Sequence, residues 1–180
     1  MQNSKGLQST SVIWITGLSG SGKTTLATEL ALQIKIKNNA VVMLDGDILR
    51  TIFCPDFSDK ASYDRASRIE LAMQYSKLCH ELSKQRITVI IATISLFKEI
   101  HSWNRENLPG YFEIYLKVPM QTLRQRDPKG IYKKFDAGQL INVAGLDLKV
   151  DEPANPDLIL DDHDLASLQH TVSELINTLF

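Results

Sequence analysis

The chain has 180 residues, of which 43% are hydrophobic and 23% charged, and its formal net charge is −1. These values are ordinary for one globular domain with a substantial core. The near-zero charge excludes a global field that would attract nucleic acid or an anionic membrane, and no apolar run approaches the length that crosses a bilayer. We therefore expect neither a nucleic-acid polymer nor a membrane among its partners.

The N-terminal segment and the cysteine content bear on the cellular compartment. Residues 1–11 are polar and precede only a strand-length apolar run, so they do not form a secretory signal, and we expect a flexible N-terminus. The two cysteines are too few for a disulfide framework, and the four histidines show no zinc-ligand spacing. The sequence predicts a cytoplasmic protein built as a single domain over residues 1–180.

Strand-like and helical segments alternate along the chain. Short apolar runs predict strands over residues 12–16, 40–44, 88–92, 111–118 and 158–160. Helical spacing of apolar residues predicts helices over 22–37, 48–53, 59–86, 95–107 and 165–179, with a further short helix after Pro119. This alternation favours an α/β fold, in which a parallel five-stranded sheet carries helices on both faces.

Residues 127–155 do not follow this alternation. They are rich in Lys, Gly, Asp and Pro and show weak apolar periodicity. A long excursion of this kind is the usual form of a mobile lid over a binding site. We place the lid region at about residues 124–155.

A phosphate-binding pattern, G-x-x-x-x-G-K-[ST], stands at residues 17–24, directly after the first predicted strand. The glycines let backbone N–H groups point into one concavity, and the following helix adds its positive N-terminal end. Lys23 would reach the β- and γ-phosphates of ATP, and the Thr24 hydroxyl would ligate Mg²⁺. The residues expected to bind ATP are Gly17, Ser19, Gly20, Ser21, Gly22, Lys23, Thr24, Thr25 and, from the lid region, Arg124.

Two aspartates follow the second predicted strand, and ligands of such sheets bind outside the carboxyl ends of the strands. We expect Asp45 to hold Mg²⁺ through water and Asp47 to accept a proton from the hydroxyl of an acceptor substrate. The alternative is that Asp47 only caps the helix over 48–53.

Three arginines could form a second anion site. Arg50 lies one helical turn from Asp47, whereas Arg65 and Arg68 share a helix face. Arginine forks match phosphate or sulfate oxygens, although arginines are also common on solvated helix faces. Polar clusters after four strands are what a transferase that joins two substrates needs.

Taken together, these motifs resemble those of the adenylylsulfate kinases, which phosphorylate the ribose 3′-hydroxyl of adenosine 5′-phosphosulfate with ATP. The resemblance covers about residues 12–161 and implies a three-layer P-loop kinase fold. Its parts are the phosphate loop, Leu44-Asp45-Gly46-Asp47 with Arg50, Phe57-Ser58, Asp64-Arg65, Ile94-Ser95, Arg126-Asp127-Pro128-Lys129-Gly130 with Tyr132-Lys133-Lys134, and Glu152-Pro153 with Asn155-Pro156. The run over 126–134 is the most specific of them.

The resemblance implies roles for the acceptor-site residues. Asp47 matches the residue near the acceptor hydroxyl, and Arg50 and Arg65 match the arginines that hold the acceptor. Phe57 matches an aromatic residue that stacks on the acceptor base, and Lys133 matches a lid lysine near the acceptor. Ile94 and Ser95 match an Ile-Ser-Pro motif whose serine is described as phosphorylated in some members. We expect Ser95 to bind substrate first and to carry phosphate only secondarily.

The chain departs from the family pattern only on the acceptor side. Arg68 stands where members usually have asparagine, and Val143-Ala144-Gly145 replaces Phe-Thr-Gly, whose phenylalanine is the second aromatic wall for adenine. Leu96-Phe97 follows Ser95 in place of Pro-Tyr. Base–aromatic stacking is worth about 1–3 kcal/mol, so losing one wall could weaken adenine binding about tenfold or more.

The acceptor therefore stays open at this point. The first expectation is adenylylsulfate. The alternative is cytidine diphosphoramidate, the acceptor of a divergent member in bacterial capsule modification, because its smaller base is compatible with Val143 and its changed anhydride with Arg68. A non-catalytic nucleotide switch is a third possibility, but the base-reading N-K-x-D sequence of GTPases is absent. Family members are often dimers, so a homodimer is also expected.

Overall fold

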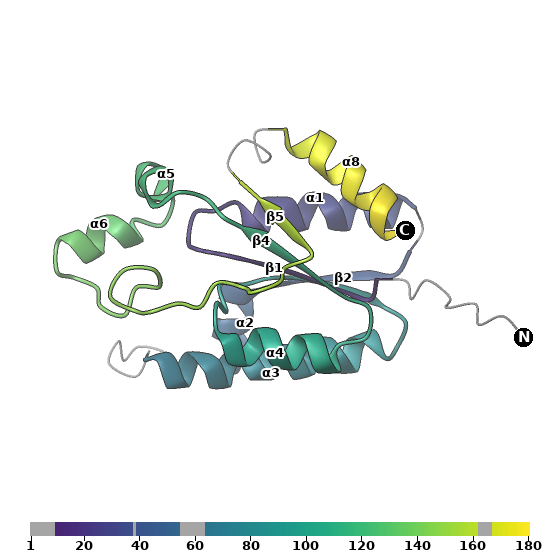
Figure 1. Ribbon diagram of the computed structural model, residues 1–180, viewed down its shortest axis with the longest axis horizontal. Helices are drawn as coiled ribbons and strands as arrows, with labels where there is room; N and C mark the ends of the chain where they lie inside the picture. The colour runs from purple at the N-terminus through teal and green to yellow at the C-terminus, as the bar shows by residue number, and fades with distance from the viewer. Residues whose placement is uncertain (1–9, 38, 55–63, 162–166) are drawn as a thin grey trace, which may run out of the picture.

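The computed structural model describes residues 10–37, 39–54, 64–161 and 167–180 (Figure 1). Five parallel strands form one sheet in the order β2-β3-β1-β4-β5. Their bounds are β1 (Val12–Gly17), β2 (Val41–Asp45), β3 (Thr88–Ala92), β4 (Tyr111–Leu116) and β5 (Leu158–Leu160). The predicted α/β class and its five-stranded parallel sheet are confirmed.

Helices cover both faces of this sheet (Figure 1). On one face lie α1 (Lys23–Ile36) and α8 (Leu168–Leu179), and on the other α2 (Gly46–Phe53), α3 (Arg65–Ser83) and α4 (Lys98–Asn107). The alternation of β1 explains the two cores: Ile13 and Ile15 are buried with α1 and α8, whereas Val12 and Trp14 are buried with α2, α3 and α4. None of the helices in the described parts of the chain has the length and apolar character of a membrane span.

The predicted excursion over 127–155 is more ordered than its sequence suggests. After α5 (Met120–Arg126) the chain forms α6 (Ile131–Asp136), and both helices lie beyond the carboxyl ends of the strands (Figure 1). A small apolar cluster of its own is built from Val118, Leu123, Tyr132 and Val143, with Leu18 of the phosphate loop packed against it. These residues are irregularly spaced, so their periodicity is weak although they meet in space. The predicted flexible segment 1–11 lies almost entirely outside the described residues.

A buried polar cluster fixes the chain where it returns from the lid region to β5. Glu113 of β4 is 3% exposed, and its carboxylate lies 2.6 Å from His101 Nδ1 and accepts the Tyr111 hydroxyl at 3.0 Å. His101 Nε2 lies 3.2 Å from the carbonyl oxygen of Asp151, and the Glu113 backbone N–H donates to Asp157 at 2.8 Å. The cluster therefore ties residues 151–157 to the sheet.

Replacing Glu113 with Ala should lower the free energy of unfolding by about 3–5 kcal/mol, because His101 and Tyr111 would lose a buried partner. Urea unfolding measures this loss. Glu106→Ala on the exposed face of α4 is the matched control and should change stability by less than about 0.5 kcal/mol. Equal effects of the two substitutions would contradict the role given to the cluster.

Candidate active site

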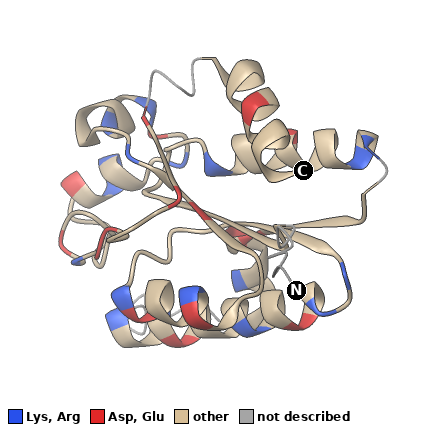
Figure 2. Cartoon of the chain, turned by 45° about the vertical axis from the view of Figure 1, so that its right-hand side comes forward, with Lys and Arg blue, Asp and Glu red and all other residues tan. Residues whose placement is uncertain are grey.

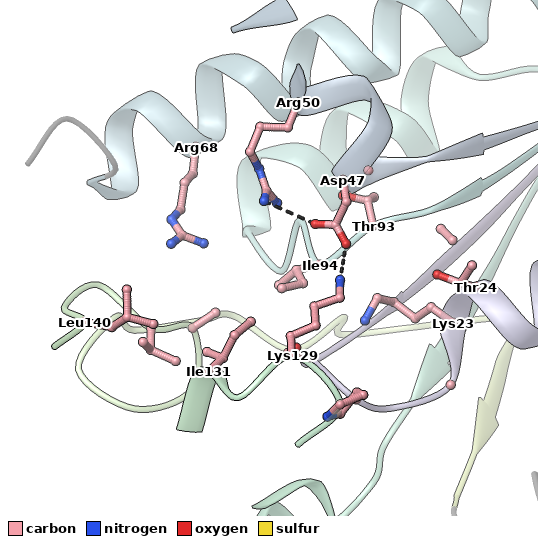
Figure 3. A pocket seen from close by; sticks show the side chains of 18 of the residues that line it. Lys23, Thr24, Asp47, Arg50, Arg68, Thr93, Ile94, Lys129, Ile131 and Leu140 are labelled. Carbon is pink, nitrogen blue, oxygen red and sulfur yellow. Dashed lines mark hydrogen bonds and ion pairs between the residues drawn. The ribbon is translucent and has the colours of Figure 1, made fainter. Parts of the chain in front are cut away.

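A cavity of about 720 Å³ opens at the carboxyl edge of the sheet. Five segments meet there: the phosphate loop with the start of α1, α2, Arg68 of α3, the residues after β3 and the lid region (Figure 3). Lys and Arg residues are mixed with Asp and Glu residues on both sides of the sheet (Figure 2), and the cavity draws basic and acidic side chains from elements far apart in the sequence.

The phosphate loop has the backbone that its glycines predict. Gly22 precedes α1 with φ +96°, a left-handed conformation that side chains rarely adopt. Gly17 lies so close to β4 that a Cβ atom there would stand 2.8 Å from the Leu116 carbonyl oxygen. Lys23 Nζ donates to the Leu18 carbonyl at 2.7 Å, so the loop closes around the lysine. Residues 22–25 at the start of α1 line the same end of the cavity, where a helix N-terminus favours an anion.

The surroundings of Lys23 lower the pKa of its amine. Burial, together with the nearby positive charge of Lys129, lowers the pKa of Lys23 to about 7 against the opposing effects of Asp47 and Asp45. A phosphate group beside the amine would favour the charged form, because an opposite charge at close range raises the pKa of a base.

Thr24 and Asp45 are brought together as the sequence predicts. The Thr24 hydroxyl donates to Asp45 Oδ2 at 2.8 Å. The described residues hold no cluster of three or more His, Cys, Asp or Glu side chains suited to a metal ion. Mg²⁺ needs no such cluster, since it is usually held by one or two protein oxygens, substrate phosphates and water. The two oxygens, set beside the phosphate loop, fit that ligand set.

Asp45 also settles the question of the helix cap. Its Oδ1 accepts the Asp47 backbone N–H at 2.8 Å, and α2 begins at Gly46. The alternative that Asp47 caps this helix is therefore wrong. The Asp47 side chain is left to the cavity, because the cap is Asp45, two residues earlier.

Asp47 lies between two cations (Figure 3). Its carboxylate pairs with Arg50 Nη1 at 3.1 Å and with Lys129 Nζ from the lid. Partial burial acts to raise its pKa, but Lys129, Arg50 and Lys23 outweigh burial, so the pKa of Asp47 lies below its ordinary value. Asp47 is consequently ionised at neutral pH and better suited to orient an acceptor hydroxyl than to keep its proton.

The lid region is docked on the phosphate loop. The Tyr132 hydroxyl donates to the Ser19 carbonyl at 2.9 Å, and Pro128 packs beside Gly20, where a Cβ atom would stand 3.4 Å from the proline ring. Asp127 holds the intervening turn by accepting the backbone N–H groups of Tyr132 at 3.2 Å and Lys133 at 3.0 Å. This turn carries Lys129 into the cavity.

The other end of the cavity is bridged by a side chain that departs from the family pattern. Arg68 Nη2 donates to the Asn142 carbonyl at 2.7 Å, from α3 across to the lid region. Asp147 accepts the backbone N–H groups of Asn142 at 2.7 Å and Val143 at 2.6 Å, which fixes that loop. Val143 is 7% exposed and lines the cavity together with Ile94.

Several predicted site residues do not line this cavity: Gly17, Ser21 and Asp45 lie just behind it, and four others have their own partners or face solvent. Ser95 is buried with its Oγ 2.9 Å from Thr93 Oγ1, and Arg65 pairs with Asp151 at 2.7 Å. Arg124 pairs with Asp136 at 2.5 Å, and Lys133 is exposed on α6. Phe57, the predicted stacking residue, lies outside the described residues. The roles given to Phe57 and to these four others stay predictions.

Several residues that line the cavity were not assigned to the site from the sequence. Lys129 and Pro128 were named only as members of the family-specific run over 126–134, and the structure pairs Lys129 with Asp47. Other lining residues carry no motif that could have found them, among them Ile131, Leu140, Ile141 and Asn142.

A phosphate loop, a carboxylate beside it and a docked lid over one cavity define a P-loop kinase. The model of the adenylylsulphate kinase family matches residues 9–161. Cytidine diphosphoramidate kinase from Campylobacter jejuni is 39% identical over 168 residues, which are 93% of this chain and 95% of that protein. A probable adenylyl-sulfate kinase from Aeropyrum pernix is 36% identical over 169 residues, or 91% and 89% of the two chains.

A solved structure supports the same family. The APS kinase CysC of Mycobacterium tuberculosis in complex with AMPPNP and APS is similar with a TM-score of 0.84 at 30% identity, covering 94% of this chain and 96% of that one. The chain therefore belongs to the adenylylsulfate kinase family and is an ATP-dependent nucleotide kinase.

The affinity for MgATP should fall as pH rises above about 7, because the free Lys23 amine must then take up a proton to meet the phosphates. Above that pH the dissociation constant should rise about tenfold per unit, while below it Lys23 is already protonated and the affinity stays level. Titration calorimetry at saturating Mg²⁺ in buffers of different ionisation enthalpy should show proton uptake near pH 8 and little near pH 6. An affinity and proton balance that do not change with pH would contradict this assignment, and Lys23→Met is the control that should lose the dependence.

Proposed function

We propose that the protein uses MgATP to phosphorylate the ribose 3′-hydroxyl of cytidine diphosphoramidate. The observation that carries this proposal is the acceptor end of the cavity, where Arg68 bridges to Asn142 and Val143 forms the wall. An aliphatic wall offers less stacking surface than an aromatic one, which costs a purine more than a pyrimidine.

Similarity supports the same acceptor. The Campylobacter jejuni relative, named as cytidine diphosphoramidate kinase, is 39% identical over nearly the full length of both chains. The adenylyl-sulfate kinase from Bacillus licheniformis is 38% identical over 161 residues, but it covers 87% of this chain. The proposal thus rests on the cavity wall first and on similarity second.

The donor half of the site supports the use of MgATP. The phosphate loop and the start of α1 would hold the triphosphate, with Lys23 beside the transferring group. Thr24 and Asp45 would hold Mg²⁺, which supplies positive charge to the β- and γ-phosphates when bound. Asp47 would orient the acceptor hydroxyl, and the docked lid would exclude water that competes as acceptor.

Adenylylsulfate is the second candidate, which the sequence alone placed first. Arg50 and the exposed rim of the cavity would serve the anhydride of either nucleotide, and several relatives are named adenylyl-sulfate kinases. The two acceptors differ at the base and at the anhydride, so the choice between them falls on Val143 for the base and Arg68 for the anhydride. A homodimer remains a prediction for either.

Purified protein should turn over cytidine diphosphoramidate with a kcat/KM at least about tenfold above that for adenylylsulfate, which corresponds to the loss of one aromatic wall for adenine. Transfer of labelled phosphate from ATP to each nucleotide measures both values. The reverse preference would overturn the proposed acceptor and leave the adenylylsulfate alternative.

Val143→Phe is the matched variant for this assay. It supplies the missing aromatic wall at the cavity, so the preference should shift toward adenylylsulfate by about tenfold. Leu32→Phe on the exposed face of α1 is a control that should not shift it. An unchanged preference in Val143→Phe would remove the wall from the explanation of specificity.

A further inference from the structure

We propose that Lys129 is a catalytic residue, whose ammonium group stabilises the negative charge of the phosphoryl group during transfer. The proposal rests on one part of the proposed function, the transfer of the γ-phosphoryl group from ATP, and holds for either acceptor nucleotide. Lys129 belongs neither to the phosphate-loop motif nor to the arginines expected to hold the acceptor, so neither of them gives it a role.

The position of Lys129 is the first support. Its side chain and that of Lys23 point into the same part of the cavity beside Asp47 (Figure 3). Lys23 marks where the β- and γ-phosphates lie, and Asp47 marks where the acceptor hydroxyl lies. The group being transferred passes between those two places, within reach of both ammonium groups.

The rigidity of the turn is the second support. The turn that carries Lys129 is held against the phosphate loop, because the Tyr132 hydroxyl donates to the Ser19 carbonyl and Pro128 packs beside Gly20. Asp127 fixes the same turn from within through two backbone N–H groups. Charge stabilisation in catalysis depends on groups that are already in place, and this turn holds Lys129 in place relative to the phosphate loop.

The balance of charge is the third support. Arg50 already pairs with Asp47 at 3.1 Å, so Lys129 is a second cation on one carboxylate. When Lys23 is protonated, Lys23, Arg50 and Lys129 face Asp45 and Asp47 with three positive charges against two negative ones. An anion with several oxygens would complete this cluster, and the transferring phosphoryl group is such an anion.

The transfer of the γ-phosphoryl group can be followed bond by bond with these residues. The acceptor oxygen forms a bond to the γ-phosphorus as the bond from that phosphorus to the β–γ bridging oxygen breaks, and the electron pair leaves with ADP. The hydroxyl proton passes by way of Asp47 to solvent. Lys129 and Lys23 remain protonated and offset the charge on the phosphoryl oxygens.

A purely structural role for Lys129 would be weak. The side chain is half-exposed, and its ion pair with Asp47 is half-exposed on both sides. Pairs of this kind contribute little to stability. Removing the charge should therefore leave the fold intact and expose any catalytic effect.

The test is Lys129→Met, with Lys129→Arg and the exposed Lys35→Met as controls. Lys129→Met should lower kcat about 10²-fold, the scale of losing one preorganised group, with KM for both substrates and the melting temperature little changed. Lys129→Arg should recover much of the loss because the charge is kept, and Lys35→Met should match the wild type. A kcat for Lys129→Met within about threefold of wild type, or a loss confined to KM, would overturn the proposal.

A double-mutant cycle with Asp47→Asn separates the two possible actions of Lys129. If Lys129 stabilises the phosphoryl group, adding Lys129→Met to Asp47→Asn should lower kcat further by at least about tenfold. If Lys129 only holds Asp47, the double variant would be no slower than Asp47→Asn, which would overturn the proposal. Should wild-type protein transfer phosphate to neither nucleotide, the proposed acceptors fail, and the same variants are compared by ATP hydrolysis to water, where the same losses are expected.

Discussion

The hydrogen bond from the Tyr132 hydroxyl to the Ser19 carbonyl joins the lid region to the phosphate loop, two segments 113 residues apart. Around it, Pro128 lies beside Gly20, and Leu18 packs into the apolar cluster of the lid region. This contact decides where the turn over 127–130 lies, and therefore where Lys129 lies. Without it the donor half of the cavity would have one cation from the loop and no partner from the lid. The sheet supplies the rest of the frame, since the carboxyl ends of β1, β2 and β3 bring the loop, Asp47 and Thr93 to one edge.

The charges of the site act on one another through this arrangement. Asp47 is kept ionised by Lys129, Arg50 and Lys23, and Lys23 has a lowered pKa because it is buried next to another cation. Such a cluster disfavours the charged form of Lys23 alone and favours it once an anion enters, which predicts that nucleotide binding is coupled to proton uptake. At the acceptor end the contacts are different in kind. Arg68 donates to the Asn142 carbonyl and Val143 forms an aliphatic wall, so under the proposed function this end would select by shape and hydrogen bonding rather than by charge alone.

The sequence predicted the strands, the phosphate loop and the Thr24–Asp45 pair because each depends on local pattern: apolar runs, glycine spacing and the ends of strands. Prediction from the sequence was less reliable where a contact joins segments that are far apart in the chain. The order of the lid region was missed because Leu123, Tyr132 and Val143 share no regular spacing. Lys129 was named only within the family-specific run over 126–134, since its pairing with Asp47 spans 82 residues and depends on the docked turn. The alternative role for Asp47, as the cap of α2, placed the cap two residues too late in the chain. Asp45 and Asp47 are both good cap residues, and only the backbone conformation decides between them.

The most direct test of this account is a crystal structure of the protein with ADP, Mg²⁺, aluminium fluoride and the acceptor nucleotide, in which the fluoride stands in for the transferring phosphoryl group. The account predicts that Lys129 Nζ and Lys23 Nζ each lie within about 3 Å of a fluorine, with Tyr132 still bonded to Ser19. A structure in which Lys129 pairs only with Asp47, or points into solvent while the fluoride is held by the phosphate loop alone, would contradict it.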